Sequence, residues 1–196
     1  RGYAELLNTY ELTADERLDY VQTIERQANH MKNLLDDFNL TMRLRNQQLP
    51  MERIPVNFVS FVRELVIDLL NDPNAASYNI EFDAPDKAIE KHIDAHYMRR
   101  ALLNFFYNAI THNDANVTLH ITIDDAGQLT IADDGKGIAA HDVEHIFERY
   151  YRGTNTATIE GTGLGMAIAR DIIEAHDGSV LLHSEQGVGT TVTITL

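Results

Sequence analysis

The 196-residue sequence contains no cysteine and no tryptophan, and its apolar runs are short. Without cysteine, disulfides and thiolate metal sites are excluded, a composition that suits the reducing cytoplasm. No stretch approaches the roughly 18 consecutive apolar residues of a membrane-spanning helix, so we expect no direct membrane contact in this segment. Basic residues are also few: 16 Lys and Arg against 30 Asp and Glu give a net charge of −14. Since nucleic acids bind basic surfaces, this charge argues against a nucleic-acid partner.

Proline is rare as well, and its distribution predicts two parts of the chain. Residues 1–49 contain none, whereas Pro50 and Pro55 follow closely and predict a linker that ends the helical part. Thr13-Ala-Asp-Glu16 is a capping box, the pattern that begins a helix. After it, apolar residues recur at spacings of three and four, as in a bundle or dimer helix: Val21, Ile24, Ala28, Met31, Leu35, Phe38 and Met42. The alternative is an ordinary helix that packs on its own domain.

The segment from Tyr3 to Leu7 predicts the end of a partner helix, joined to the long helix by a turn at 9–12. The second part, 50–196, has a mixed pattern of helices and strands. We expect helices at 58–70, 95–111, 142–148 and 163–176, an irregular stretch at 149–162, and strands at 78–83, 117–124, 127–133, 178–184 and 189–195. The last three strands alternate apolar and polar residues. These elements predict an α+β fold, a mixed sheet with helices on one face.

Two glycine-rich segments indicate the chemistry of the second part: 133–138 (Asp-Asp-Gly-Lys-Gly-Ile) and 161–165 (Gly-Thr-Gly-Leu-Gly). The later one runs into an amphipathic helix, so its backbone N–H groups can cradle phosphate at the positive helix end. Asp133 ends an apolar strand before a glycine turn, where its carboxylate can accept a hydrogen bond from an adenine amino group. Either segment alone is weak evidence, and Asp-Gly is also a common hairpin turn. Together they predict a nucleotide site.

Polar and basic residues nearby fit the same site. Asn104 and Asn108 lie one turn apart on one helix face, where their amide oxygens can hold Mg²⁺. The alternative is a merely polar helix face. Arg149 and Arg152 precede a short polar stretch, 153–160, typical of a mobile lid, and can reach a triphosphate unless they are a solvated basic pair. Half of the basic residues of 51–196 lie in or beside these motifs, so the local charge can differ from the acidic whole: Arg99, Arg100, Lys136, Arg149 and Arg152.

The motifs resemble those of sensor histidine kinases. Asn104…Asn108-Ala109, Asp133…Gly137, Phe147 and Gly161…Gly165 stand in the order of that family's N box, first glycine box, phenylalanine box and second glycine box. The resemblance covers nearly the whole chain. It implies the two-layer α/β sandwich of the gyrase, heat-shock-chaperone, histidine-kinase and mismatch-repair ATPases for the catalytic ATP-binding domain (50–196). A long helix from a truncated dimerisation and phosphotransfer hairpin (1–49) would precede it.

The resemblance also implies an activity, cofactors and partners. The activity is transfer of the ATP γ-phosphate, with Mg²⁺, to a histidine, for relay to an aspartate of a response-regulator receiver domain. A second kinase protomer, bound through the hairpin, would be another partner, and the parent protein would be anchored in the bacterial inner membrane. Asn104 and Asn108 would bind Mg²⁺ and, with Arg152, be catalytic. The implied nucleotide-binding set is Asn104, Asn108, His112, Asp133, Gly135, Gly137, Ile138, Tyr151, Arg152, Gly161, Thr162, Gly163, Leu164, Gly165 and Thr190.

Two departures from the family pattern bear on activity. None of the nine histidines has the surroundings of the family's phosphoacceptor, so we expect that histidine upstream, a weakened dimer and no autophosphorylation of this chain. Thr111 stands where many relatives have a basic residue, and His112 or Arg152 is expected to compensate. Asn104, which cannot accept a proton at neutral pH, disfavours the water-activating ATPases. The alternative to a kinase is a nucleotide-binding regulatory module that acts by protein contacts without phosphotransfer.

Overall fold

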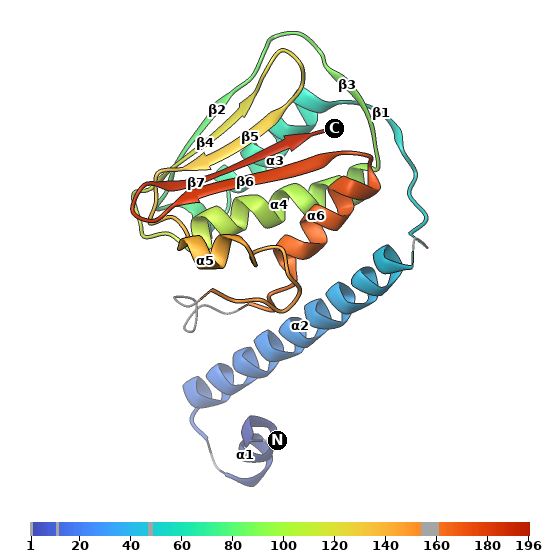
Figure 1. Ribbon diagram of the computed structural model, residues 1–196. Helices are drawn as coiled ribbons and strands as arrows, with labels where there is room; N and C mark the ends of the chain where they lie inside the picture. The colour runs from blue at the N-terminus through green and yellow to red at the C-terminus, as the bar shows by residue number, and fades with distance from the viewer. Residues whose placement is uncertain (1, 11, 47–48, 154–160) are drawn as a thin grey trace.

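The computed structural model describes residues 2–10, 12–46, 49–153 and 161–196. Its N-terminal part consists of α1 (Gly2–Thr9) and the long α2 (Ala14–Arg45), which extends away from the remaining chain in Figure 1. The predicted capping box begins α2: the Thr13 N–H donates to Glu16 Oε2 over 2.9 Å, and the Glu16 N–H donates to Thr13 Oγ1 over 3.3 Å. These bonds satisfy backbone donors that the first helical turn leaves unpaired. No described helix is both long and apolar enough to cross a membrane.

A five-stranded sheet forms the centre of the second part, with its strands in the order β2, β4, β5, β7, β6. The strands are β2 (Asn79–Asp83), β4 (Thr118–Ile123), β5 (Leu129–Asp133), β6 (Ser179–Glu185) and β7 (Gly189–Thr195). β2 is parallel to β4 and the other neighbours are antiparallel, so the sheet is mixed, as predicted. Along β4, Leu119, Ile121 and Ile123 are buried and alternate with more exposed polar residues. One face of the sheet therefore supplies the core.

Three helices cover that face: α3 (Phe58–Leu70), α4 (Ala95–Thr111) and α6 (Gly165–Ala175). Each buries an apolar side against the sheet, with Phe58, Phe106 and Ile168 fully enclosed. α4 and α6 pack against each other, and Figure 1 shows them side by side beneath the strands. The predicted two-layer α/β sandwich, with helices on one face of a mixed sheet, is confirmed.

Two predictions about short elements are wrong. Residues 54–57, expected within a linker, form β1 (Ile54–Asn57), which pairs with β3 (Glu90–Ile93) in a separate two-stranded sheet where edge positions tolerate Pro55. The helix expected at 142–148 is only α5 (Ala140–Val143). Beyond it, the His145 N–H donates to the carbonyl three residues back, and the Glu148 N–H does the same. Bonds of this span wind the chain more tightly than an α-helix, so the segment forms successive turns.

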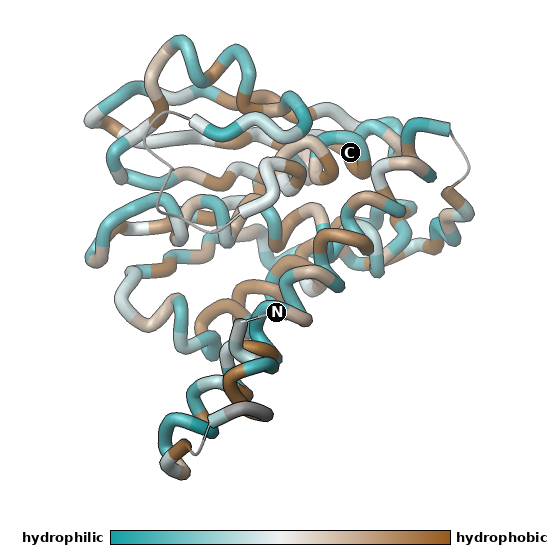
Figure 2. The backbone as a smooth tube through the Cα atoms, turned by 90° about the horizontal axis from the view of Figure 1, so that it is seen from below, coloured by the Kyte–Doolittle hydropathy of each residue, from teal (hydrophilic) through white to brown (hydrophobic). Residues whose placement is uncertain are grey.

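The C-terminal turns of α2 belong to the core of the second part. Leu40 and Thr41 are 5% and 6% exposed, and α2 packs against α6. An ion pair joins Asp37 of α2 to Arg100 of α4. The apolar residues of α2 are otherwise mostly exposed: Leu18, Val21, Ile24, Met31, Leu35, Phe38 and Met42. Figure 2 shows hydrophobic and hydrophilic positions alternating along this helix. Among the described residues, the buried positions of α2 thus lie near its C-terminal end, and a dimer through this apolar stripe stays a prediction.

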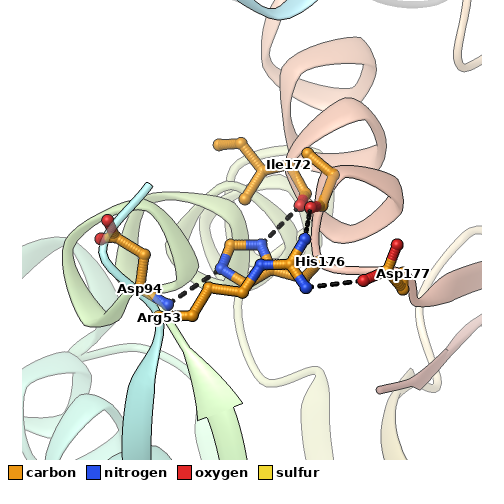
Figure 3. A network of polar contacts seen from close by, with 6 residues as sticks. Arg53, Asp94, Ile172, His176 and Asp177 are labelled. Carbon is orange, nitrogen blue, oxygen red and sulfur yellow. Dashed lines mark hydrogen bonds and ion pairs between the residues drawn. The ribbon is translucent and has the colours of Figure 1, made fainter. Parts of the chain in front are cut away.

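A buried polar network ties the linker to the ends of α4 and α6 (Figure 3). His176, directly after α6, is 6% exposed. Its Nδ1 lies 2.7 Å from a carbonyl oxygen of α6, and its Nε2 accepts the Asp94 N–H over 3.0 Å, so the geometry assigns a neutral ring protonated at Nδ1. Asp94 caps α4 and accepts the Glu52 N–H over 2.9 Å. Arg53 pairs with Asp177 at 2.6 Å.

Stability should fall in mild acid because of this network. Burial lowers the pKa of His176 below its ordinary value, and the Arg53 guanidinium acts in the same direction. The unfolded ring titrates near about pH 6.5, so below that pH the unfolded chain binds more protons than the folded chain. The contribution of His176 to stability is therefore complete above about pH 6.5 and is lost as the pH falls below it.

Urea unfolding of wild type and His176→Gln at about pH 7.5 and 5.5 measures this effect. We expect the variant, which keeps an acceptor near the Asp94 N–H, to lose less stability between the two pH values than wild type. His183→Gln, at an exposed strand position, is the matched control and should behave like wild type. An equal loss in wild type and His176→Gln would assign the acid sensitivity to other groups.

Candidate nucleotide site

Two adjoining hollows lie between α4, β5 and the segments that precede α6, and they share Asn108, His112, Ile146 and Gly153. The surface of the first is mainly apolar, and Asp133 lies among its polar residues. The second is lined mainly by polar residues and glycines. All of the predicted nucleotide-binding residues line one or both hollows, except Gly135 and Leu164. A ligand with a flat apolar end and a charged end fits this arrangement.

Asp133, the last residue of β5, is fixed in the first hollow by hydrogen bonds. Its Oδ1 accepts from Asn113 Nδ2 over 2.9 Å and from the Gly135 N–H over 3.0 Å. Burial raises the pKa of Asp133, and these two hydrogen bonds oppose the rise. A carboxylate has about four lone-pair sites, so it can still accept a hydrogen bond from a ligand. The apolar wall around it consists of Phe105, Ala109, Ile131, Ile138, Ile146 and Val192.

Asn113, which the sequence analysis did not single out, organises the glycine turn. A Cβ on Gly135 would lie 2.0 Å from Asn113 Oδ1, and the same oxygen accepts the Lys136 N–H over 3.0 Å. Gly137 has a φ of +63°, and a Cβ there would lie 2.0 Å from the Glu185 carbonyl oxygen. Gly135 is therefore required for the turn rather than for direct ligand contact. The only sequence signal for Asn113 is an amide just beyond the end of α4.

The second hollow gathers the predicted metal and phosphate residues. Asn104 and Asn108 line it from α4, and a Cβ on Gly165, the first residue of α6, would lie 3.0 Å from Asn104 Oδ1. The N-terminus of α6 thus begins beside the two asparagines, where a helix end favours anions such as phosphate. Gly163 has a φ of +68°, and a Cβ there would lie 2.7 Å from the backbone carbonyl carbon of Tyr150. Leu164 is 1% exposed and packs in the core, so its predicted place in the ligand set does not involve its side chain.

The basic residues near the motifs divide into two groups. Lys136 lines the first hollow and Arg152 the second. Burial lowers the pKa of His112, and the charges of Lys136 and Arg152 lower it further. These cations therefore surround the point where the hollows meet, beside Thr111. The other basic residues form ion pairs: Arg99 with Asp68 at 2.6 Å, Arg100 with Asp37, and Arg149 with Asp171 at 2.5 Å.

Arg149 lies apart from the two hollows. It pairs with Asp171 on the second turn of α6 and lines neither hollow, so its contact with a triphosphate stays a prediction. Phe147 packs against the core, with the Arg170 guanidinium 5.2 Å from its ring centroid. The Tyr150 N–H donates to the Gly163 carbonyl over 2.8 Å and joins the two ends of the loop. The predicted lid, 153–160, lies outside the described residues except for its first position.

The second hollow fits a magnesium ion that is bound together with phosphate. In the described ranges, no group of three or more His, Asp or Glu side chains is placed to hold a metal ion. Asn104 and Asn108 offer two neutral amide oxygens to the same hollow. Such an incomplete set suits Mg²⁺, because this ion usually keeps several waters and takes its remaining ligands from phosphate oxygens.

Comparison with known proteins identifies the class. Residues 93–196 match the family of histidine kinase-, DNA gyrase B- and HSP90-like ATPases, and the chain belongs to that family. Within it, the chain is a catalytic domain of the sensor histidine kinase type. The sensor histidine kinase YvrG of Bacillus subtilis is 33% identical over 199 residues, which cover 98% of this chain and 34% of YvrG. The B. subtilis sensor histidine kinase WalK is 28% identical over 184 residues, covering 90% of this chain and 30% of WalK.

The chain spans about a third of the length of these two relatives. Among solved structures, full-length ShkA in complex with AMPPNP is similar, with a TM-score of 0.74 and 28% identity over 98% of this chain and 41% of ShkA. The histidine kinase AdeS of Acinetobacter baumannii has a TM-score of 0.71 and 21% identity, over 99% of this chain and 91% of AdeS. At that identity the AdeS comparison shows the fold alone, and this fold agrees with the predicted sandwich.

Proposed function

We propose that this chain binds ATP with Mg²⁺ and transfers the γ-phosphate to a histidine on a helix outside residues 1–196, for later relay to a response-regulator aspartate. The single observation that supports this most strongly is the meeting of the two hollows at Asn108 and His112. Asp133 and an apolar wall lie on one side of that point, and Asn104 and Arg152 lie on the other. ATP has the same order of chemistry: a flat base with an amino donor, followed by a chain of anionic groups.

Each side chain has a role in this proposal. Asn104 and Asn108 hold Mg²⁺, which when bound neutralises charge on the phosphate chain. Arg152 donates to the γ-phosphate, where a planar charged fork suits phosphoryl oxygens. His112 or Arg152, which line the second hollow together with Thr111, compensates for the basic residue that many relatives have there. Because an amide at 104 cannot take a proton from water, the arrangement favours an imidazole nucleophile from another helix over hydrolysis.

The partners and placement belong to the same proposal. A second kinase protomer binds through the exposed stripe of α2, whose apolar residues are otherwise left in water. Residues 1–49 serve as the remainder of the dimerisation and phosphotransfer hairpin, and 50–196 as the catalytic domain. A receiver domain accepts the phosphate. The chain lies in the cytoplasm, as part of a parent protein that is anchored in the inner membrane. The observation that ShkA was solved with AMPPNP supports a nucleotide ligand here.

Thr111 favours a second candidate function, a nucleotide-binding regulatory module without phosphotransfer. It lines the second hollow at a position where a basic side chain would contact phosphate. In this candidate the nucleotide is bound, but the phosphate chain is held too weakly for transfer. The two functions therefore differ in phosphotransfer and agree in ATP binding.

We expect the chain alone to bind ATP with Mg²⁺ and to acquire no phosphate, since no histidine here has acceptor-like surroundings. When a complete helical hairpin with an acceptor histidine is supplied in trans, acid-labile, alkali-stable label should appear on the hairpin. Radiolabelled ATP and separation of the two chains measure this. Label on the 1–196 chain itself would contradict the absence of an acceptor. Binding of ATP without transfer to the hairpin would favour the regulatory module.

A further inference from the structure

A buried acid next to the two hollows has no role in the function proposed above. Asp142 lies in α5 and is 4% exposed. Its carboxylate lines the first hollow, yet it belongs to none of the glycine or asparagine motifs. A buried carboxylate is costly unless it is hydrogen-bonded, so its partners indicate what it is for.

Two of the residues that Asp142 contacts lie on either side of Arg152 in the sequence, and the exposed ring of the neighbouring His141 lies 3.3 Å from Asp142 Oδ1. The Tyr151 hydroxyl donates to Asp142 Oδ1 over 2.5 Å, and this bond raises the pKa of the Tyr151 phenol. On the other side, a Cβ added to Gly153 would lie 3.1 Å from Asp142 Oδ2, so the Gly153 backbone packs directly on the second carboxylate oxygen. One carboxylate thus contacts the residue before Arg152 and the residue after it.

A third contact fixes the same segment from its start. The Tyr150 N–H donates to the Gly163 carbonyl over 2.8 Å. Tyr150 has a φ of +66°, in the left-handed region, so the chain turns sharply at this residue. Arg152 follows two residues later and lines the second hollow with Asn104 and Asn108. Contacts of residues 150, 151 and 153 thus hold the chain around Arg152. Binding of a ligand by Arg152 therefore costs less conformational entropy than it would from an unrestrained segment.

We propose that Asp142 is a positioning residue for phosphate binding, which holds Arg152 on the phosphate side of the site through the Tyr151 hydroxyl and the Gly153 backbone. This inference rests on the proposed function, because it concerns the residue that is to contact the γ-phosphate. It gives Tyr151 a different part from the one implied by the family resemblance. Its hydroxyl is bound by Asp142, so Tyr151 acts through Arg152.

Tyr151→Phe tests this directly, because it removes the hydroxyl and retains the ring, whose centroid lies 5.3 Å from that of His145. Binding of ATP and of adenosine is measured by calorimetry in the presence of Mg²⁺. We expect ATP affinity to fall about 5- to 30-fold, the factor that corresponds to one or two kcal/mol, and adenosine affinity to stay unchanged. Tyr150→Phe, on the neighbouring exposed tyrosine, is the matched control and should bind both ligands as wild type does.

A double-mutant cycle with Arg152→Gln separates positioning from a general structural effect. If Tyr151 acts through Arg152, Tyr151→Phe should cause no further loss of ATP affinity in the Arg152→Gln background. Asp142→Asn is a second variant to combine with Arg152→Gln, because it keeps the side-chain volume and weakens the contacts with the Tyr151 hydroxyl and the Gly153 backbone. It should follow the same pattern, with the melting temperature recorded for every variant.

The outcomes are distinct. Equal losses for ATP and adenosine in Tyr151→Phe, or additive losses with Arg152→Gln, would overturn the positioning role. Unchanged ATP affinity in both Tyr151→Phe and Asp142→Asn would also overturn it, while leaving the proposed function intact. A wild-type chain that binds no ATP would overturn the proposed function and this inference together.

Discussion

Asn108→Ala is expected to abolish the Mg²⁺ dependence of nucleotide binding while leaving the fold intact. Asn108 lies where the two hollows meet, and its amide oxygen is one of only two proposed protein ligands. Mg²⁺ demands near-ideal octahedral geometry and dehydrates reluctantly, so the loss of one of two anchors should release it from the protein. The side chain is half-buried and fills no core position, and alanine is the best helix former, so the helix should tolerate the change.

Calorimetric titration with ATP, once with Mg²⁺ and once with a chelator, measures the effect. For wild type we expect at least about a tenfold difference in affinity between the two conditions, and for Asn108→Ala a ratio close to one. Asn79→Ala makes the same change at an exposed position of the edge strand β2 that lines neither hollow, and should retain the wild-type ratio. An unchanged ATP affinity in Asn108→Ala would contradict the role of Asn108 as a Mg²⁺ ligand.

Asp133→Asn should weaken ATP binding and relax the choice between adenine and guanine. In the folded chain, Asn113 and Gly135 both donate to Asp133 Oδ1. An asparagine that keeps its oxygen toward these donors presents an NH₂ group to the ligand, and this group opposes the adenine amino donor. The expected cost is about 1–3 kcal/mol, or roughly 5- to 150-fold in affinity. Guanine carries a carbonyl oxygen at the corresponding ring position, so GTP should lose less.

The measurement is the ratio of ATP to GTP affinity in each variant. Asp134→Asn is the matched control, because Asp134 is the adjacent acid, lines neither hollow, and accepts the Thr118 N–H over 2.7 Å. Its ratio should stay at the wild-type value. Equal losses of ATP and GTP in Asp133→Asn would give Asp133 a purely structural role in holding the glycine turn.

Much of this site could be predicted because its information is local. A capping box, alternation along a strand, and glycines followed by an amphipathic helix each depend on residues a few positions apart. The sheet and its covering helices followed from such patterns. Asn104 and Asn108 could be placed together because one turn of a helix fixes their spacing, whatever surrounds them.

The features that the sequence did not reveal depend on contacts between distant residues. β1 pairs with β3 across more than thirty positions, and Pro55 made its segment look like a linker. The partner of Arg149 lies 22 residues away on α6, which no spacing rule connects to it. Asp142 is one of 30 acidic residues, and only the folded chain shows that it is buried beside Tyr151 and Gly153.

The attachment of α2 has a mechanical consequence. The helix is held by Leu40 and Thr41 near its C-terminal end, and about 26 residues separate Leu40 from Ala14, an arm of roughly 39 Å at 1.5 Å per residue. A tilt of about 5° around this fulcrum moves Ala14 by about 3 Å. Asp37, which lines the second hollow, lies three residues from the fulcrum and moves by only about 0.4 Å. Ala14 and Asp37 lie on the same side of this fulcrum, so a movement of the far end reaches the second hollow reduced about tenfold.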